Sequence, residues 1–159
     1  MILVLLGTQQ NSFHRLLEQI QKNIDNGNIK QEVVIQKGYT KFESKDMEIY
    51  NQMSSEELQE LIKKADLIIT HGGVGSIISA ITNDKKVIAV PRLQKYKEHV
   101  NDHQLEIIES FNEMGYIIGI KSVAELEIAL KEVEKFEPKK YISNTGNIIK
   151  IVEDFIENN

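Results

Sequence analysis

Residues 67–80 have the sequence Leu-Ile-Ile-Thr-His-Gly-Gly-Val-Gly-Ser-Ile-Ile-Ser-Ala, in which a short apolar run meets three closely spaced glycines. The run has the length of a buried strand, and helical spacing begins near Ser76. Glycines let a backbone approach an anion, and the amides at a helix start attract negative charge. We therefore predict a strand, a phosphate-binding turn and a helix, with a ligand-free tight turn as the alternative. The candidate binding residues are His71, Gly72, Gly73, Gly75 and Ser76.

Short apolar runs alternate with amphipathic segments on both sides of this stretch. Strands are predicted at residues 2–6, 32–36, 67–70 and 87–90, and helices at 12–23, 54–65, 76–83, 100–114, 122–135 and 147–157. Ser54 with Glu57, and Ser122 with Glu125, match capping boxes at two helix starts. The alternation predicts an α/β domain with a Rossmann-like, doubly wound parallel sheet covered by helices on both faces. Residues 38–55 are the least regular, and we expect a functional loop there.

The chain of 159 residues has the length of one domain, and its hydrophobic content of 41% is enough for a sizeable core. We expect residues 144–159 to form a C-terminal helix that packs on this domain or docks a partner. The 19 basic and 24 acidic residues leave a net charge of -5, which excludes a general basic surface for nucleic acid or anionic membranes. The lack of cysteine excludes disulfides and thiolate metal sites and fits a cytoplasmic location. The apolar start, about six residues long, is too short to span a membrane.

A second glycine turn follows the first predicted strand, at Gly7, Thr8 and Gln9. In doubly wound sheets, ligands bind at the carboxyl ends of strands where the strand order reverses. The two turns are therefore expected to face one crevice, and two anion-binding turns suit a diphosphate better than a single phosphate. An ordinary helix start near Ser12 is the alternative. A dinucleotide-binding domain is disfavoured, because the G-x-G-x-x-G spacing is missing and Gln36 ends the second strand in place of an acidic residue.

Polar residues crowd into the stretch that follows the predicted strand 87–90. Glu98, Asp102 and Gln104 can each accept hydrogen bonds from sugar hydroxyls, which makes this a candidate saccharide-binding segment. Metal binding by His99, Asp102 and His103 is a second interpretation, provided that a helix already begins by His99. A solvated polar loop is the third. The candidate residues here are Arg92, Glu98, His99, Asp102, His103 and Gln104.

Four stretches of the chain resemble the Alg13-like, glycosyltransferase family 28 C-terminal group, and within it the bacterial PssE-type subunits of capsule and exopolysaccharide synthesis. They are Gly-Thr-Gln at 7–9 with Phe-His-Arg-Leu-Leu at 13–17, Ala-Asp-Leu-Ile-Ile-Thr-His-Gly-Gly at 65–73, Val-Pro-Arg at 90–92, and Glu-His-Val-Asn-Asp-His-Gln at 98–104. The last of these is the most specific, and the final predicted helix adds little to the resemblance.

The resemblance implies the C-terminal, donor-binding half of a GT-B glycosyltransferase that is split over two chains. This half would hold a UDP-sugar without a metal, while an Alg14-like or PssD-like membrane-associated partner would bind a lipid-linked saccharide as acceptor at the inner face of the membrane. By position, the turns at 7–9 and 72–76 would hold the diphosphate, and the segment around Gly38 would approach the uracil. Asp102, His103 and Gln104 would contact the sugar, and Arg92 or a nearby lysine would stabilise the UDP that departs in an inverting hexosyl transfer. The catalytic base is expected from the partner, and self-association of the isolated chain is left open.

Three places depart from the family pattern. Ser79 replaces a glutamate that can bond the ribose hydroxyls, His14 replaces an aspartate, and Asp84-Lys85-Lys86 replaces Gly-Lys-Pro in an expected surface turn. Ser79 leaves a second hypothesis open, in which the chain is a non-catalytic enhancer subunit of the same complex and has lost donor binding.

Overall fold

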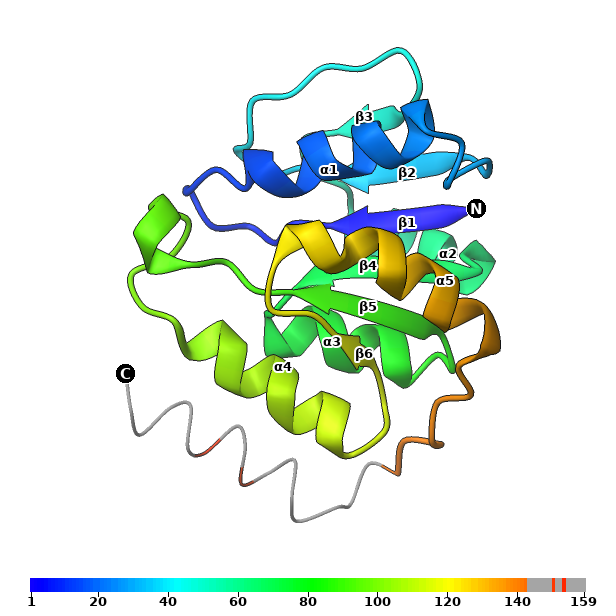
Figure 1. Ribbon diagram of the computed structural model, residues 1–159, viewed down its shortest axis with the longest axis vertical. Helices are drawn as coiled ribbons and strands as arrows, with labels where there is room; N and C mark the ends of the chain where they lie inside the picture. Colours follow the sequence, from blue (N-terminus) through cyan, green and yellow to red (C-terminus); the bar gives the residue numbers. More distant parts are fainter. Residues whose placement is uncertain (143–149, 151–152, 154–159) are drawn as a thin grey trace.

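The computed structural model describes residues 1–142 together with Lys150 and Glu153. Within this part, one sheet is formed in the strand order β3-β2-β1-β4-β5-β6 (Figure 1). Every neighbouring pair is parallel, so that Ile2 lies opposite Val33 on one side and Leu67 on the other. This order is that of a doubly wound, Rossmann-like sheet, and the predicted fold class is confirmed. The strands are β1 (Ile2–Leu5), β2 (Val33–Gln36), β3 (Glu48–Tyr50), β4 (Leu67–His71), β5 (Lys86–Val90) and β6 (Ile118–Gly119).

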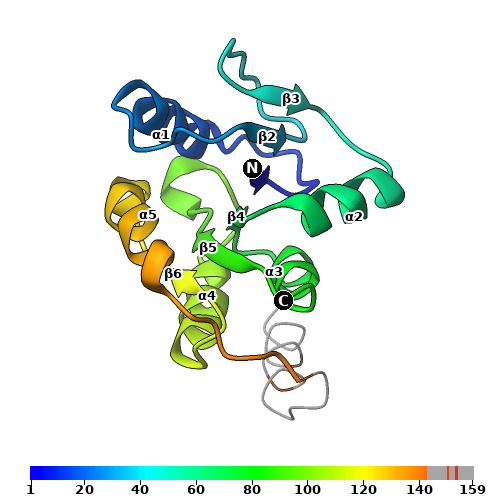
Figure 2. The same ribbon diagram turned by 90° about the vertical axis from the view of Figure 1, so that its right-hand side faces the viewer.

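Helices cover both faces of the sheet, with α1 and α5 over one face and α2, α3 and α4 over the other (Figure 2). Successive strand residues alternate between the two cores: Ile2 and Val4 belong to the first, and Leu3 and Leu5 to the second. Burial on both faces is why the central strands are continuously apolar. The helices are α1 (His14–Asp25), α2 (Ser55–Lys64), α3 (Val74–Ile81), α4 (His103–Glu113) and α5 (Leu126–Lys135), with the short 3-10 helices η1 (Gln94–Tyr96) and η2 (Val123–Glu125).

Three helices that shape the candidate site begin at other residues than predicted. α1 begins at His14 and not at Ser12. α3 begins at Val74 and not at Ser76, because Gly73 already takes the capping position. α4 begins at His103 and not at Val100. The predicted last helix at 147–157 belongs to the segment 144–159. This segment lies outside the described residues, except for Lys150 and Glu153.

The sequence patterns miss the two edge strands, β3 and β6. β3 has three residues, of which Glu48 and Tyr50 are exposed, and β6 has two residues. Segments this short cannot show a periodic pattern. The predicted loop at residues 38–55 therefore contains an edge strand.

The two predicted capping boxes are confirmed, at Ser54 with Glu57 and at Ser122 with Glu125. The turn 84–86, expected as a surface feature, also caps two helices. Lys85 Nζ donates to two carbonyls at the carboxyl end of α2, at 2.6 and 2.9 Å, and Lys86 Nζ donates to two at the end of α5, both at 3.0 Å. Positive charge at a helix carboxyl end is favourable, so these lysines tie the turn to both helical layers.

Candidate functional site

The two glycine turns lie at one edge of the sheet, at its topological switch point. β1 and β4 are neighbours, and the chain leaves β1 for α1 on one face and β4 for α3 on the other (Figure 1). The polar segment after β5 starts at the same edge, next to β4. The topology therefore places both turns at the edge of the sheet where ligands of doubly wound sheets bind.

His71 is the residue on which the two turns converge. A Cβ atom added to Gly7 would lie 2.5 Å from His71 Nε2, and one added to Gly73 would lie 2.3 Å from His71 Cε1. Real Cβ contacts are never this short, so both turns need glycine because the imidazole ring lies between them. Gly7 also has a φ of +76°, which side chains on L-residues rarely adopt. The ring and the two glycines thus form one packed unit.

The His71 side chain is 7% exposed, and its Nδ1 atom lies 3.2 Å from Gln104 Nε2. Burial, together with the positive charge of Arg92, lowers the pKa of His71 to about 3. The imidazole is therefore neutral at physiological pH. In the ligand-free chain, His71 therefore offers one N–H donor and no positive charge.

The amino end of α3 supplies free backbone donors at this edge. The amides of Val74, Gly75 and Ser76 have no partner inside the helix, and no side chain caps it. Gly75 is exposed, and nothing lies within 4 Å of the place where its Cβ would be. Together with the positive end of the helix dipole, these amides form an open anion-binding surface.

Arg92 is placed differently from the sequence prediction. Its side chain is 1% exposed, and its guanidinium donates to the carbonyls of Leu6, Asn11 and Glu98. It also lies over the Phe13 ring, 5.1 Å from its centroid. Its Nε atom is the single buried side-chain polar atom without a partner in the described part of the chain. A guanidinium occupied in this way joins the loop after β1 to the segment after β5 and does not reach a leaving diphosphate.

Glu98 is also a correction to the predicted sugar contacts. It is 2% exposed, and its carboxylate accepts two bonds from Arg15, at 2.7 and 2.8 Å, and one from the Leu93 amide at 3.0 Å. The Arg15 guanidinium lies 3.9 Å from the centroid of the Tyr96 ring. Sequence analysis missed Arg15 in this role, although Arg15 belongs to one of the stretches that carry the resemblance. The bidentate pair fixes the segment after β5 onto α1.

Gln104 is the third corrected residue, because it is 3% exposed and not free to contact a sugar. Its Oε1 atom accepts from the amide of Gly72 at 3.0 Å and from the amide of Arg92 at 2.9 Å. The side chain therefore bridges the carboxyl ends of β4 and β5 from the first turn of α4.

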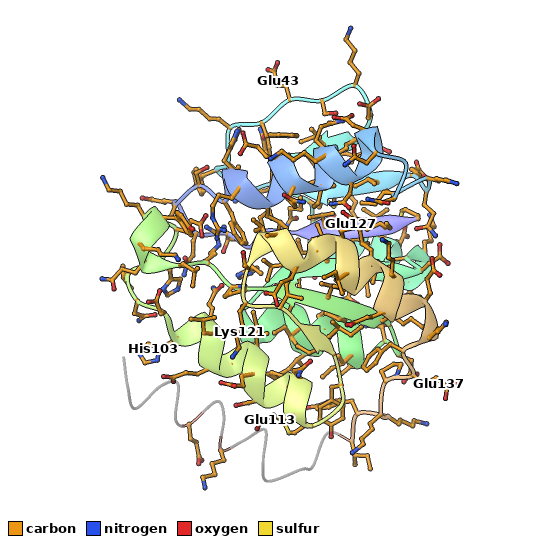
Figure 3. All side chains as sticks on the ribbon, in the orientation of Figure 1. Glu43, His103, Glu113, Lys121, Glu127 and Glu137 are labelled. Carbon is orange, nitrogen blue, oxygen red and sulfur yellow. The ribbon has the colours of Figure 1, made fainter. Side chains whose placement is uncertain are left out.

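The other three polar candidates lie in the loop before α4 or at its start. His99 is 8% exposed, its Nδ1 atom accepts from the Asn101 amide, and its Nε2 atom lies 3.0 Å from Gln9 Nε2. Asp102 is exposed, and its Oδ1 atom accepts from the Gln94 amide at 2.8 Å. His103 stands in the first turn of α4 and points away from the sheet (Figure 3), 3.4 Å from a carboxylate oxygen of Glu106.

The metal interpretation required a helix that begins by His99, and α4 begins four positions later. His99 and His103 consequently do not share a helical face. Within the described residues, no group of three or more histidine, aspartate or glutamate side chains is arranged to hold a metal ion.

Gly38 lies directly against the first turn. Its φ is +57°, and a Cβ atom there would come within 2.7 Å of the Gly7 carbonyl oxygen. A hollow of about 400 Å³ opens beside it, lined by Lys37, Gly38, Tyr39, Thr40, Lys41, Asn51 and Gln52. The segment expected near a base is thus contiguous with the turn expected near a diphosphate.

Another groove, of about 500 Å³, lies at the opposite, amino edge of the sheet and is bordered by Ile2, Leu67, Lys86 and α5. Ligands of doubly wound sheets bind beyond the carboxyl ends of the strands, so this groove is not the candidate site.

Gln36, at the end of β2, is buried and accepts from the Met53 amide at 3.0 Å. It therefore does not serve as the ribose contact that a dinucleotide-binding domain requires.

Ser79 lies on α3, one turn beyond Ser76 and facing α2. Its hydroxyl accepts from Gln59 Nε2 at 3.3 Å. The position of the expected glutamate thus carries a short side chain that is joined to a neighbouring helix.

Comparison with known proteins places the chain among glycosyltransferases. The model of the glycosyltransferase family 28 C-terminal domain matches residues 1–158. The UDP-N-acetylglucosamine transferase subunit ALG13 of Candida albicans is 34% identical over 110 residues, which are 69% of this chain and 32% of that protein. The Homo sapiens protein of the same name is 32% identical over 75 residues, 47% of this chain and 6% of its own length. The chain therefore spans a third or less of these curated relatives.

Solved structures resemble the whole of the chain. The solution structure of ALG13 has a TM-score of 0.63 at 17% identity and covers 98% of this chain and 96% of its own. MurG of Acinetobacter baumannii has a TM-score of 0.61 at 16% identity and covers 98% of this chain, but 49% of its own. The likeness concerns the fold, and it confirms the predicted architecture of a GT-B C-terminal domain. Across the described residues, no helix is long and apolar enough to cross a membrane.

Proposed function

The chain belongs to the glycosyltransferase family 28 C-terminal domain family, and we propose from this premise that it is the UDP-sugar-binding half of a two-part glycosyltransferase. The observation that carries the proposal is the convergence of the two glycine turns on His71 at the switch point of the sheet. This edge combines free helix amides, an exposed turn after β1 and a neutral imidazole, a combination that suits a diphosphate.

The diphosphate would lie between the two turns. The amides of Val74, Gly75 and Ser76 would donate to one phosphate, and the Gly7–Gln9 turn, with the Thr8 hydroxyl, would donate to the other. Since Arg92 is buried and its two terminal nitrogens donate to backbone carbonyls, neutral donors and the helix dipole would carry most of the stabilisation of the departing UDP. We propose that donor binding in this arrangement needs no metal.

The base and the sugar would extend to opposite sides of the diphosphate. The hollow beside Gly38 and Tyr39 suits the uracil, because it is contiguous with the first turn. Asp102 and His103 stand at the start of α4 and are the polar candidates in that segment that remain accessible, so we assign the sugar contacts to them. Glu98 and Gln104 would act indirectly, by holding this segment in place.

The acceptor half would come from another chain. This protein forms one α/β domain over its described residues, and it covers about half of a GT-B chain such as MurG. Its curated relatives are named as subunits of a UDP-N-acetylglucosamine transferase. We propose an Alg14-like or PssD-like membrane-associated partner that brings a lipid-linked saccharide and the catalytic base to the cytoplasmic face of the membrane. The transferred group would be a hexose, in inverting transfer for capsule or exopolysaccharide synthesis.

A second candidate function rests on Ser79. Its hydroxyl is joined to Gln59, and its side chain is shorter than the glutamate of the family pattern, which favours an enhancer subunit that keeps the fold without binding a donor. A Ser79→Glu variant separates the two functions. UDP binding that is kept or tightened in this variant supports a working donor site, whereas the absence of binding in both forms supports the enhancer.

The test is calorimetric titration of the purified chain with UDP, in EDTA and again with Mg²⁺, with NAD as control ligand. We expect UDP to bind equally well in both buffers. Binding of NAD alone would overturn the proposal. If UDP binds, the next step is to assay transfer from UDP-sugars with the co-expressed partner.

A further inference from the structure

The amide group of Gln104 is held in one orientation by two backbone donors. Its Oε1 atom accepts from the amides of Gly72 and Arg92, at 3.0 and 2.9 Å. Because the oxygen must face these two N–H groups, the Nε2 atom must face the other way, toward His71. The orientation of this amide therefore follows from the hydrogen-bond network.

This orientation determines where the proton of His71 resides. Gln104 Nε2 can only donate, and it lies 3.2 Å from His71 Nδ1, so Nδ1 must be the accepting, unprotonated nitrogen. A neutral imidazole then carries its proton on Nε2. Two charged or titratable groups influence the ring, Arg92 from the segment after β5 and His99 from the loop that follows, and both disfavour a second proton.

The Nε2 atom is the part of the ring that faces the two glycine turns. It would lie 2.5 Å from a Cβ on Gly7 and 2.7 Å from one on Gly73. Within residues 1–142, Nε2 makes no hydrogen bond to the protein. It is also not one of the buried polar atoms that lack a partner, so it is accessible to solvent. The N–H group therefore opens onto the space between the turns.

We propose that Gln104 is a positioning residue, which holds His71 as an Nε2–H donor aimed at an anionic group bound between the turns after β1 and β4. The proposal rests on the proposed function for the identity of that anion, a nucleoside diphosphate. It assigns Gln104 an indirect role, in place of the sugar contact expected from its position. The tautomer of His71 is the same whether or not a ligand is bound, so it can be measured in the free protein.

The first test measures that tautomer in the unmodified protein. Long-range ¹H–¹⁵N correlation spectra distinguish the protonated from the unprotonated ring nitrogen, and the chain has only four histidines to assign. We expect His71 to be protonated at Nε2 between pH 6 and 8 and to accept at Nδ1. Protonation at Nδ1 in the free protein would overturn the proposal without any use of a variant.

The second test uses a Gln104→Glu substitution to move the proton of His71 from Nε2 to Nδ1. A glutamate can still accept from the two amides, but its other oxygen can only accept from Nδ1, so the proton moves to Nδ1 and Nε2 presents a lone pair. A hydrogen bond to a charged phosphate is then replaced by repulsion, and we expect UDP to bind about tenfold to a hundredfold more weakly at pH 8. Gln94→Glu is the matched control, because it adds the same charge at an exposed position on η1 and should leave the affinity unchanged.

The outcomes separate this proposal from the proposed function. If the wild-type chain binds UDP and Gln104→Glu binds it equally well with the tautomer reversed, the positioning role of Gln104 is wrong and the donor site stands. If His71 is protonated at Nε2 but no form of the chain binds UDP, the donor site is wrong and the role of Gln104 in setting the tautomer stands. A loss of affinity in Gln94→Glu as large as in Gln104→Glu would assign the effect to charge and refute the proposal.

Discussion

Replacing Gly7 by alanine tests whether the packing of His71 between two turns shapes the site. The methyl group would meet two penalties, a backbone with φ at +76° and an approach of 2.5 Å to His71 Nε2. Gly27 provides a matched control, since its φ is +75° but nothing lies within 4 Å of its Cβ position. Gly27→Ala therefore isolates the backbone penalty.

The backbone penalty for an L-residue in this region is about 1 to 2 kcal/mol. Crowding in a packed site adds about 1 to 3 kcal/mol. We expect Gly27→Ala to lower the free energy of unfolding by the first amount and Gly7→Ala by the sum of the two. For a domain of this size, each kcal/mol lowers Tm by about 2 to 4 °C.

Urea denaturation of both variants measures the difference, and a double-mutant cycle assigns it. In a His71→Ala background the ring is absent, so Gly7→Ala should cost no more than Gly27→Ala costs in the wild type. UDP titration should show weaker binding for Gly7→Ala and an unchanged affinity for Gly27→Ala. Equal destabilisation by the two single substitutions would refute the packing argument.

Three further predictions concern stability. Glu98→Gln should lower the free energy of unfolding by about 1 to 3 kcal/mol in urea titrations, because it breaks a bidentate pair whose Arg15 side chain is partly exposed. Glu106→Gln, at a surface pair, is the control and should change the free energy of unfolding by less than about 0.5 kcal/mol. Asp84→Gly should raise the free energy of unfolding by about 0.5 to 1 kcal/mol, and with it Tm, because glycine adopts the φ of 56° at this position without strain. An unchanged or lower Tm would contradict this. The pKa of His71 is 6.5 in the unfolded chain and about 3 in the folded one, so between these pH values only the unfolded chain binds the extra proton. The free energy of unfolding should therefore fall by about 1.4 kcal/mol per pH unit as the pH drops from about 6.5 toward 3. His71→Gln should flatten this slope.

The architecture was predictable because the central strands and helices carry strong local signals. Continuous apolar runs and capping boxes mark the elements one by one, and the glycine-rich stretch after β4 marks the switch point. The edge strands were not predictable, since β3 and β6 are held by pairing with β2 and β5 and not by a pattern of their own. The start of α4 was misplaced because its amphipathic pattern continues into the preceding loop.

The roles within the candidate site were harder to predict than its location. The polar types of Arg92, Glu98 and Gln104 indicated ligand contacts, but all three are buried and bond to the protein itself. Their partners include backbone carbonyls and amides, which any sequence supplies and which therefore leave no signal. Arg15 lies 83 positions from Glu98 in the chain, and only the folded structure brings the two together.

The most direct measurement is an amide ¹H–¹⁵N spectrum of the chain titrated with UDP in EDTA. We expect the largest shift changes at Thr8 and Gln9, at Gly75 and Ser76, and around Gly38, because these residues belong to the two turns and the adjoining segment to which we assign the donor. Shift changes confined to the groove at the amino edge, or none at saturating UDP, would contradict the assignment of the donor site to the two glycine turns.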